Sequence, residues 1–505
     1  MNRFAAIILS LILTLSLAAC GGTTAETADI SDTSAEDAAA SQADVSLTGE
    51  ITGEITVSTY DTMRYKAFLE DAARLFMAQY PGTTVNVETF SAMPEIRTSE
   101  QGDKKMQIVQ KQDDPQGRAD YINKINTALM GGKGADILAI DVLPLHKYAE
   151  SGRLENLAAY MEADPEFSRG DYRENILEAV HYKGGTWFLP IDYTFNYYAY
   201  DSALVPAQTA ASFGTGEAFT TQELIGLTEL LFDGSAKLFN ISDYTKGGVN
   251  LWSKLLAENY DAFVNLEDKT ANFSDGSFAA LLETVKQYSA LGYVNQGATG
   301  QTDAGMIMRQ AGETPTDRFF FKPKNAFNLL SLFTRDLGLK MTAMAEGGTM
   351  AIGDDDEIAG IAASADDAIP FAYEQAYGIN ANSHNKETAW AFLKFLLSEE
   401  MQLNTNLMPT ALPLRNSARE KKAETVLTNA VGRQGESVSE DHLSAIAQYN
   451  RTVEALSDQI NTYEFTDTVI SDMIAAEVAY FFEGSKTAGE VAATLQSKVS
   501  LYLNE

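Results

Sequence analysis

The sequence has one cysteine, Cys20, among 505 residues. A single cysteine cannot form an intramolecular disulfide, and no metal site can be built from cysteine ligands. Cys20 directly follows an apolar run from Phe4 to Ala19 rather than lying in the body of the chain. At this position, a role as carrier of an acyl group is expected rather than a redox role.

Histidine is also scarce, and the sequence lacks the common catalytic motifs. The four histidines are scattered without His-x-x-x-His spacing, and neither Gly-x-Ser-x-Gly nor Gly-x-x-x-x-Gly-Lys occurs. The acidic run from Asp354 to Glu357 lacks the alternating ligands and the glycine of a calcium loop, so a solvated turn is expected there. No enzyme activity, metal or cofactor is predicted. The histidines are His146, His181, His384 and His442.

Positive charge is in short supply. The chain has 37 Lys and Arg against 70 Asp and Glu, which gives a net charge of −33. Phosphate backbones would repel such a chain, so a nucleic-acid partner is not expected. After the N-terminal run, no segment has the ~18 consecutive apolar residues of a membrane-spanning helix.

The N-terminus has the pattern of a secretory signal. Arg3 precedes an apolar run that is too short to span a membrane, and small residues follow it. The segment Leu17-Ala18-Ala19-Cys20 resembles the lipobox of bacterial lipoproteins, in which the peptidase cuts before the cysteine and the thiol carries a diacylglyceryl group. The resemblance implies a signal peptide over residues 1–19, a lipid on Cys20, and anchorage on the outer face of the cell membrane. An ordinary signal peptide with an incidental cysteine is the alternative.

Residues 21 to 50 consist mainly of Ala, Ser, Thr, Gly and acidic residues, with no Lys or Arg. A segment of this composition cannot bury enough apolar surface to fold. With the lipidated Cys20, residues 20–50 are therefore predicted to form a disordered acidic tether between the membrane and a folded body.

The body, from residue 51 to 505, is too long for one ordinary core, so two or more lobes are expected. It begins with a strand at 55–58, a helix with one apolar face at 65–76, and a strand at 84–87. A helix at 121–130 and a buried strand at 135–141 follow an irregular polar stretch at about 91–118. This alternation predicts a parallel sheet with helices on its faces. Capping boxes predict helix starts at Thr220 and Thr487, which have Glu223 and Glu490 three residues on.

Four segments of the body together resemble the extracellular solute-binding proteins of ABC importers, in the branch of the maltose-binding protein. They are 55–90, 120–137, 182–201 and 376–400, and the C-terminal helices around Gly484 match as well. The resemblance implies two α/β lobes of the periplasmic-binding-protein type II fold, joined by hinge-crossing strands. Lobe 1 is expected at 51–195 plus about 340–395, and lobe 2 at 196–339 plus about 396–505. The departures from the family pattern are the insertion near 91–118 and the segment 300–370.

The resemblance also implies a function and partners. The chain is expected to bind a sugar or oligosaccharide between its lobes, as a monomer, and to deliver it to ABC permease subunits in the membrane. A surface glycoside hydrolase that uses two carboxylates remains an alternative, because an acidic chain offers many carboxylate pairs. A ferric-iron receptor that uses Tyr197 and Tyr198 is another, although neighbours in a strand point to opposite faces.

Candidate ligand-binding residues follow from the chemistry of sugars, whose ring faces stack on aromatic side chains and whose hydroxyls bond to carboxylates. Asp61 and Asp141 follow strands at the sheet edge where ligands bind in such folds, although each could instead cap the next helix. Tyr60 precedes Asp61. The other candidates lie on the expected crossing segments or in loops, namely Trp187, Asp192, Tyr193, Trp252, Tyr373, Glu374 and Tyr463. For Trp187 and Trp252 a core role is equally compatible with the sequence, and Trp390 is assigned to the core.

Overall fold

The computed structural model describes residues 45–505 with gaps at 46, 48, 61–64, 91–94, 102–103, 111–114, 247–248, 298–317, 338–354, 405, 408–410, 434, 436 and 465. For residues 95–110 it describes the backbone only. The predicted signal peptide, Cys20 and most of the predicted tether lie outside the described residues, as does Asp61. Among the described helices, none combines the length and the apolar character needed to cross a membrane.

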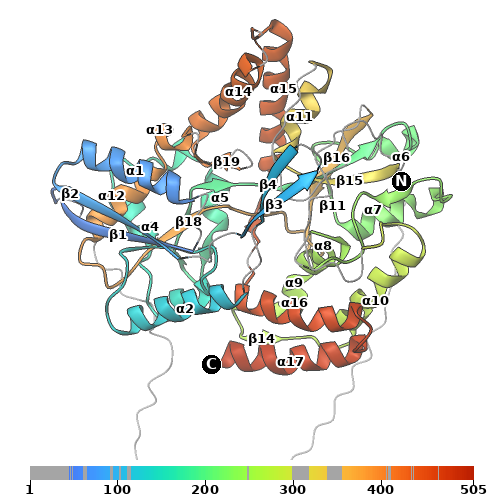
Figure 1. Cartoon of the computed structure of the whole chain (residues 1–505), viewed down its shortest axis with the longest axis horizontal. Coiled ribbons are helices and arrows are strands. Elements are labelled where there is room, and N and C mark those ends of the chain that lie inside the picture. The colour runs from blue at the N-terminus through green and yellow to red at the C-terminus, as the bar shows by residue number, and fades with distance from the viewer. Residues whose placement is uncertain are drawn as a thin grey trace, which may run out of the picture. The chain divides into compact units, whose positions relative to one another are not determined.

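The first sheet has the strand order β2-β1-β5-β18-β8 (Figure 1). The three strands predicted from the alternating pattern lie next to one another and are parallel, whereas β18 is antiparallel to both of its neighbours. The prediction of a parallel sheet is therefore correct for the first part of a mixed sheet. The strands are β1 (Gly53–Thr59), β2 (Thr83–Thr89), β5 (Ile137–Ala139), β8 (Leu189–Pro190) and β18 (Ala376–Ile379).

Helices with one apolar face cover this sheet. Helix α1 buries Phe68, Leu69 and Phe76 as its helical spacing predicts, and Phe76 packs at 5.2 Å between ring centroids against Phe392 of α12. Trp390, also on α12, is 2% exposed, which confirms its predicted place in the core. The helices of this part are α1 (Tyr65–Gln79), α2 (Pro115–Met130), α3 (Leu145–Glu150), α4 (Leu157–Ala163), α5 (Glu174–Ala179), α12 (Lys386–Leu396) and α13 (Glu399–Gln402).

The stretch expected to be irregular contains a hairpin. Strands β3 (Glu95–Gln101) and β4 (Lys104–Gln110) pair in antiparallel register, and α2 begins at Pro115. The segment is polar, so no apolar alternation revealed its strands.

The second sheet has the order β11-β16-β10-β15-β12. Its central strand, β10, has buried side chains on both faces. Tyr197 and Ala199 belong to the same hydrophobic core as the first sheet, whereas Tyr198 and Tyr200 belong to a second core. The strands are β10 (Asn196–Asp201), β11 (Ala218–Phe219), β12 (Lys237–Phe239), β15 (Phe319–Asn325) and β16 (Asp356–Ala362).

Helices of the second core come from two distant parts of the chain. Both capping boxes are present: Thr220 Oγ1 accepts from the Glu223 N–H, and Thr487 Oγ1 accepts from the Glu490 N–H. The helices are α6 (Ala207–Ala210), α7 (Thr221–Thr228), α8 (Leu251–Glu258), α9 (Tyr260–Phe263), α10 (Ser277–Ala290), α16 (Thr468–Phe482) and α17 (Ala488–Asn504), with a short hairpin of β13 (Val264–Asn265) and β14 (Thr270–Ala271).

Three more helices join the first core, to which Tyr197 and Ala199 of the second sheet also belong. Leu329 of α11, Leu427 of α14 and Val453 of α15 are all fully buried there. The helices are α11 (Asn328–Thr334), α14 (Asn416–Arg433) and α15 (Glu440–Ser457). We call the first sheet with its covering helices the first lobe, and the second sheet with the helices of the second core the second lobe.

Within the described residues, the chain crosses between the lobes at three places. The crossing segments are 189–196, which contains β9 (Asp192–Tyr193), 362–376, which contains β17 (Pro370–Phe371), and 457–468, which contains β20 (Thr462–Tyr463). They are linked by pairing of β17 with β20 and by a bridge between Thr194 and Ala372, while β9 pairs with β19 (Leu412–Pro413). The lobes exchange segments at other points than the predicted ranges, because β16 lies in the second sheet and α14 and α15 join the first core.

Candidate functional site

Two of the predicted residues lie at the same edge of the first sheet. Tyr60 follows β1 and Asp141 lies just beyond β5, and these strands are paired neighbours. The ring of Tyr60 packs against Tyr121 at 5.6 Å and against Phe90 at 6.3 Å between centroids. Tyr60 is 9% exposed, so little of its ring is open in this structure.

The crossing segments bring a second group of rings together, which we call the hinge aromatic cluster: Phe188, Phe371, Tyr373 and Tyr463. Phe188 lies 5.5 Å from Tyr373 and 5.6 Å from Tyr463 between ring centroids, and Phe371 lies 6.3 Å from Tyr463. Tyr373 is half-buried, whereas Tyr463 is 7% exposed. Two predicted residues from distant parts of the sequence thus meet at one place.

Asp141 connects the two aromatic groups electrostatically. Burial raises the pKa of both Tyr121 and Tyr373, and the nearby charge of Asp141 raises each pKa further. Asp141 itself is only partly buried. The charge of Asp141 therefore acts on one ring of each group, and its role as an acceptor for ligand hydroxyls stays a prediction.

Asp192 is fully buried and holds two crossing segments together. Its Oδ1 accepts hydrogen bonds from the backbone N–H groups of Glu374 at 2.8 Å and Gln375 at 3.3 Å. Burial raises the pKa of Asp192 to about 7, and the charge of Lys422 opposes that rise. These contacts give Asp192 a positioning role at the hinge, and Glu374 takes part in them through its backbone.

Buried polar atoms without partners lie on the same segments. Within the described residues, Asp192 Oδ2, Thr194 Oγ1 and Gln375 Nε2 have no hydrogen-bond partner. Unpaired buried polar groups are rare because each costs free energy, so ordered water or a ligand hydroxyl is expected to supply the partners. The sequence analysis missed Thr194 and Gln375; their position next to Asp192 and Tyr373 is the only signal that could have found them.

The second lobe adds two charged residues that the sequence analysis also missed. Lys254 Nζ lies 4.9 Å from the centroid of the Tyr198 ring, and burial lowers the pKa of Lys254. Burial raises the pKa of Glu464, which directly follows Tyr463, and the charge of Lys254 opposes that rise. The two charges therefore interact beside the hinge aromatic cluster.

Three predicted aromatic residues are instead packed among other residues. Trp187 is half-buried, and its Nε1 donates to the Tyr182 carbonyl at 2.8 Å. Tyr193 is fully buried, with its hydroxyl 3.3 Å from Ser457 Oγ. Trp252 is 4% exposed and packs at 5.5 Å against Phe278 in the second core. Of the two roles that the sequence left open for Trp187 and Trp252, these placements favour the structural one.

The iron site suggested by Tyr197 and Tyr198 is contradicted by the structure. The two side chains are fully buried on opposite faces of the second sheet, and the Tyr198 hydroxyl bonds to Thr221 and Glu258. They cannot ligate one ion together. In the part of the chain that the structure describes, no group of three or more His, Cys, Asp or Glu side chains could hold a metal.

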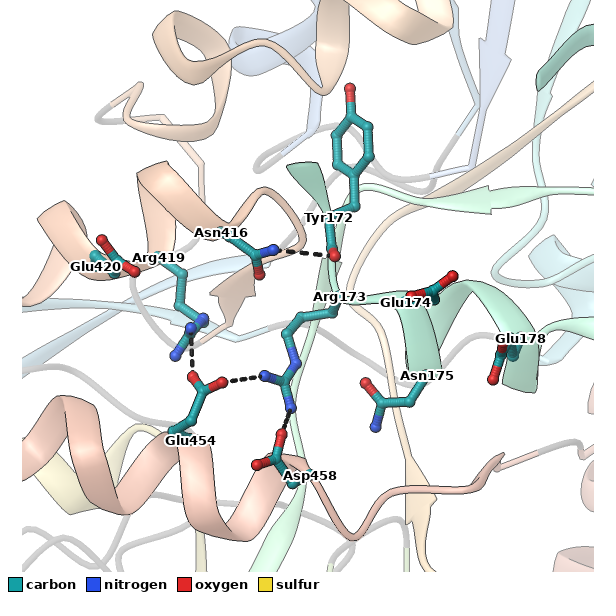
Figure 2. A pocket seen from close by; sticks show the side chains of 10 residues that line it. All are labelled: Tyr172, Arg173, Glu174, Asn175, Glu178, Asn416, Arg419, Glu420, Glu454 and Asp458. Carbon is teal, nitrogen blue, oxygen red and sulfur yellow. Dashed lines mark hydrogen bonds and ion pairs between the residues drawn. The ribbon is translucent and has the colours of Figure 1, made fainter. Parts of the chain in front are cut away.

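A cavity of about 600 Å³, which none of the predicted residues lines, lies where α5, α14 and α15 meet (Figure 2). Figure 2 shows Arg173 and Arg419 both directed at Glu454, while the Tyr172 ring points away. Arg173 contacts Glu454 at 2.9 Å and Asp458 at 2.8 Å, and Arg419 contacts Glu454 at 2.5 Å. Both arginines are at least 94% buried and paired, so this network braces the helices.

Comparisons with known proteins agree with the fold. The family model for the bacterial extracellular solute-binding protein matches residues 60–403. The GacH receptor of Streptomyces glaucescens, solved unliganded and with acarbose, is 15% identical, with 90% of this chain and 100% of that chain covered and a TM-score of 0.50. Among curated protein sequences, none matches this chain.

Two further solved structures are similar. The ABC substrate-binding protein Lmo0181 from Listeria monocytogenes, in complex with cycloalternan, is 17% identical, with 90% and 99% of the two chains covered and a TM-score of 0.51. Maltose-bound MalE3 of T. maritima is 14% identical, with 89% and 100% covered and a TM-score of 0.50. At these identities the likeness concerns the fold alone, and it confirms the predicted two-lobed α/β architecture.

Proposed function

Because the chain belongs to the bacterial extracellular solute-binding proteins, we propose that it is the receptor subunit of an ABC importer for a sugar or oligosaccharide. In this proposal the ligand binds between the lobes without a bond being made or broken. The receptor then delivers the ligand, enclosed between its lobes, to permease subunits in the membrane.

The observation that carries the carbohydrate proposal is the hinge aromatic cluster with Asp141 beside it. Rings from distant parts of the chain meet where all three crossing segments lie, and aromatic faces stack on the apolar faces of sugar rings. Asp141 offers acceptor oxygens for hydroxyls. Thr194 Oγ1 and Gln375 Nε2 are buried and lack partners within the described residues, as expected of groups that bond to a ligand.

The ligands of similar proteins support the same class. The structures compared above are described with acarbose, cycloalternan and maltose, all of them carbohydrates. Their low sequence identity shows why the individual sugar must be found by experiment.

Thermal unfolding in the presence of an oligosaccharide panel tests this function. The panel contains maltose, maltotriose, linear and cyclic glucans, xylo-oligosaccharides and manno-oligosaccharides. A sugar at 100 times its Kd should stabilise the protein by ~2.7 kcal/mol. If no carbohydrate raises the melting temperature, the carbohydrate assignment is wrong.

A substitution then tests the site itself. Tyr373→Ala should weaken binding of the sugar that stabilises the parent by about tenfold or more, because a stacking surface is lost, and calorimetry below the melting temperature measures this. Tyr480→Ala is the matched control, since Tyr480 is 45% exposed on α16 and packs away from the cluster. Equal affinities for both variants would place the ligand elsewhere.

A further inference from the structure

Several polar contacts join the first lobe to the second lobe or, at Asp467, to the end of the crossing segment 457–468. One side of each contact lies on α2, α3 or the turn between β6 (His181–Tyr182) and β7 (Gly185–Thr186), all in the first lobe. The other side lies on α16, α17 or the β13–β14 hairpin in the second lobe. In Figure 1, α2 approaches the beginning of α16 near the C-terminus.

Two of these contacts involve the beginning of α16. Arg118 of α2 forms an ion pair with Asp472 of α16, and its side chain is only 15% exposed. His146 Nδ1 of α3 lies 3.2 Å from Oδ2 of Asp467, the N-cap residue of α16. The side chains of His146 and Asp467 are at most 3% exposed, so this contact is buried.

Three more contacts involve α17 and the β13–β14 hairpin. Lys147 Nζ donates to the Tyr502 carbonyl at 2.8 Å and lies 3.7 Å from the centroid of the Tyr502 ring. Glu150 Oε2 lies 2.8 Å from Lys269 Nζ. Lys183 Nζ donates to the Glu267 carbonyl at 3.1 Å and also pairs with Glu150.

The backbone at two of these lysines is held in an unusual conformation. Lys183 has a φ of 44° and Lys269 has a φ of 54°. Both values lie in the left-handed region, which residues other than glycine seldom adopt. Both lysines reach Glu150. Each lysine lies in the turn of a β-hairpin, where a positive φ allows the chain to reverse, and the two turns direct both lysines to one carboxylate.

The contacts also lie on segments that continue directly from the candidate site. Helix α3 begins after the short turn that follows Asp141, and Asp467 follows Tyr463 after a short loop. The contact between His146 and Asp467 therefore joins two segments that each continue into the candidate site.

We propose that the contacts of Arg118, His146, Lys147, Glu150 and Lys183 with the second lobe form a latch that holds the two lobes closed, also when no ligand is bound. The inference rests on the proposed function in one respect, that the lobes open and close. It requires no particular ligand. The latch sets the fraction of receptor that is closed before the ligand arrives, and therefore the apparent affinity.

Distance measurement on the ligand-free protein tests the latch. Met130→Cys on α2 and Ala493→Cys on α17, both exposed, carry nitroxide labels in the full chain with Cys20→Ser, so that these are its only cysteines. The latch variant adds Asp472→Asn and Lys269→Gln. It removes two contacts whose second-lobe side chains are 32% and 47% exposed, so folding should be preserved.

The parent should show mainly one short label distance by double electron–electron resonance. In the latch variant, the ratio of open to closed molecules should rise by about two- to fivefold for each pair removed, which adds a longer distance. The matched control is Lys486→Gln with Lys498→Gln. It removes two ion pairs with Glu477 inside the second lobe and should leave the distance unchanged.

Two results would overturn the latch. One is a latch variant with the same distance distribution as the parent, which would make the contacts irrelevant to opening. The other is a parent that is already mostly open. No sugar is added in this experiment, so its result does not depend on the sugar panel. The latch can be confirmed even if no carbohydrate binds, and it can be disproved even if a carbohydrate does bind.

Discussion

At the scale of single residues, burial determines whether a carboxylate can meet a ligand or serves to hold the backbone in place. Asp141 is partly buried and its charge acts on a ring of each aromatic group, whereas Asp192 is fully buried and its Oδ1 accepts hydrogen bonds from two backbone N–H groups. Asp141 comes shortly after β5 and Asp192 shortly after β8, so the two residues have similar surroundings in the sequence. Only the tertiary structure separates a residue that is suited to meeting a ligand from one that fixes the hinge.

Asp192→Asn should change how stability depends on pH. Burial raises the pKa of Asp192 to about 7 from an ordinary value near 3.8, so the folded state binds a proton that the unfolded state releases. The parent therefore loses the stability contributed by this proton as the pH rises from about 4 to about 7. The asparagine keeps the acceptor oxygen and cannot ionise.

The free energy of unfolding of this variant relative to the parent should thus increase with pH over that window, by about 4 kcal/mol at most, since each unit of pKa shift corresponds to about 1.4 kcal/mol. Urea titrations at several pH values between 4 and 7 measure the difference. A difference that stays constant with pH would show that Asp192 is ionised throughout.

At the scale of elements, ion pairs connect helices that are far apart in the sequence. Arg173 precedes α5 and Arg419 lies on α14, and both reach Glu454 on α15. The carboxylate is about half exposed, but its two partners are buried. Removing it leaves two buried guanidinium groups with fewer partners, which is more costly than losing a surface pair.

Glu454→Gln should therefore destabilise the protein by about 1–3 kcal/mol, less than a fully buried pair would because Glu454 is exposed to solvent. Glu399→Gln is the control, since Glu399 and its partner Lys421 are both well exposed. It should destabilise the protein much less than Glu454→Gln does, because an exposed ion pair contributes little to stability. Urea midpoints compare the two, and equal losses would mean that the cavity network does not brace the helices.

Secondary-structure elements could be predicted where a sequence pattern has a single physical explanation. Helix α1 was readable because its buried residues repeat on a single face, and the caps at Thr220 and Thr487 because a side chain and a backbone group three residues apart satisfy each other. Strands β3 and β4 were missed because a polar hairpin has no apolar alternation. Trp252 could be neither assigned nor excluded, because the same aromatic residue suits a core and a stacking surface.

At the scale of the whole molecule, residues 45–505 form one compact unit that contains both lobes. The candidate site draws on all three crossing segments, so none of its aromatic groupings could be derived from sequence spacing alone. Lys254 and Glu464 show this most clearly, because they lie on different elements and meet only in the folded chain.

The anchor proposed for the N-terminus is testable at this scale. Cys20→Ser removes the thiol that would carry the lipid, and two acyl chains hold a protein on a membrane far more firmly than an acidic polypeptide could. The variant should move from the membrane fraction to the soluble fraction after export, as shown by immunoblotting. Retention in the membrane fraction would mean that something else anchors the protein.

The second core also has a consequence for the time at which the protein can fold. It combines residues from Tyr198 to Leu503, so the last helix, α17, is part of the same hydrophobic core as the central strand of the second sheet. A chain that leaves the cell with its N-terminus first cannot complete this core until nearly its last residue has crossed. Translocation would therefore be complete before the second lobe folds, and the chain of this lobe stays unfolded, as passage through a narrow channel requires.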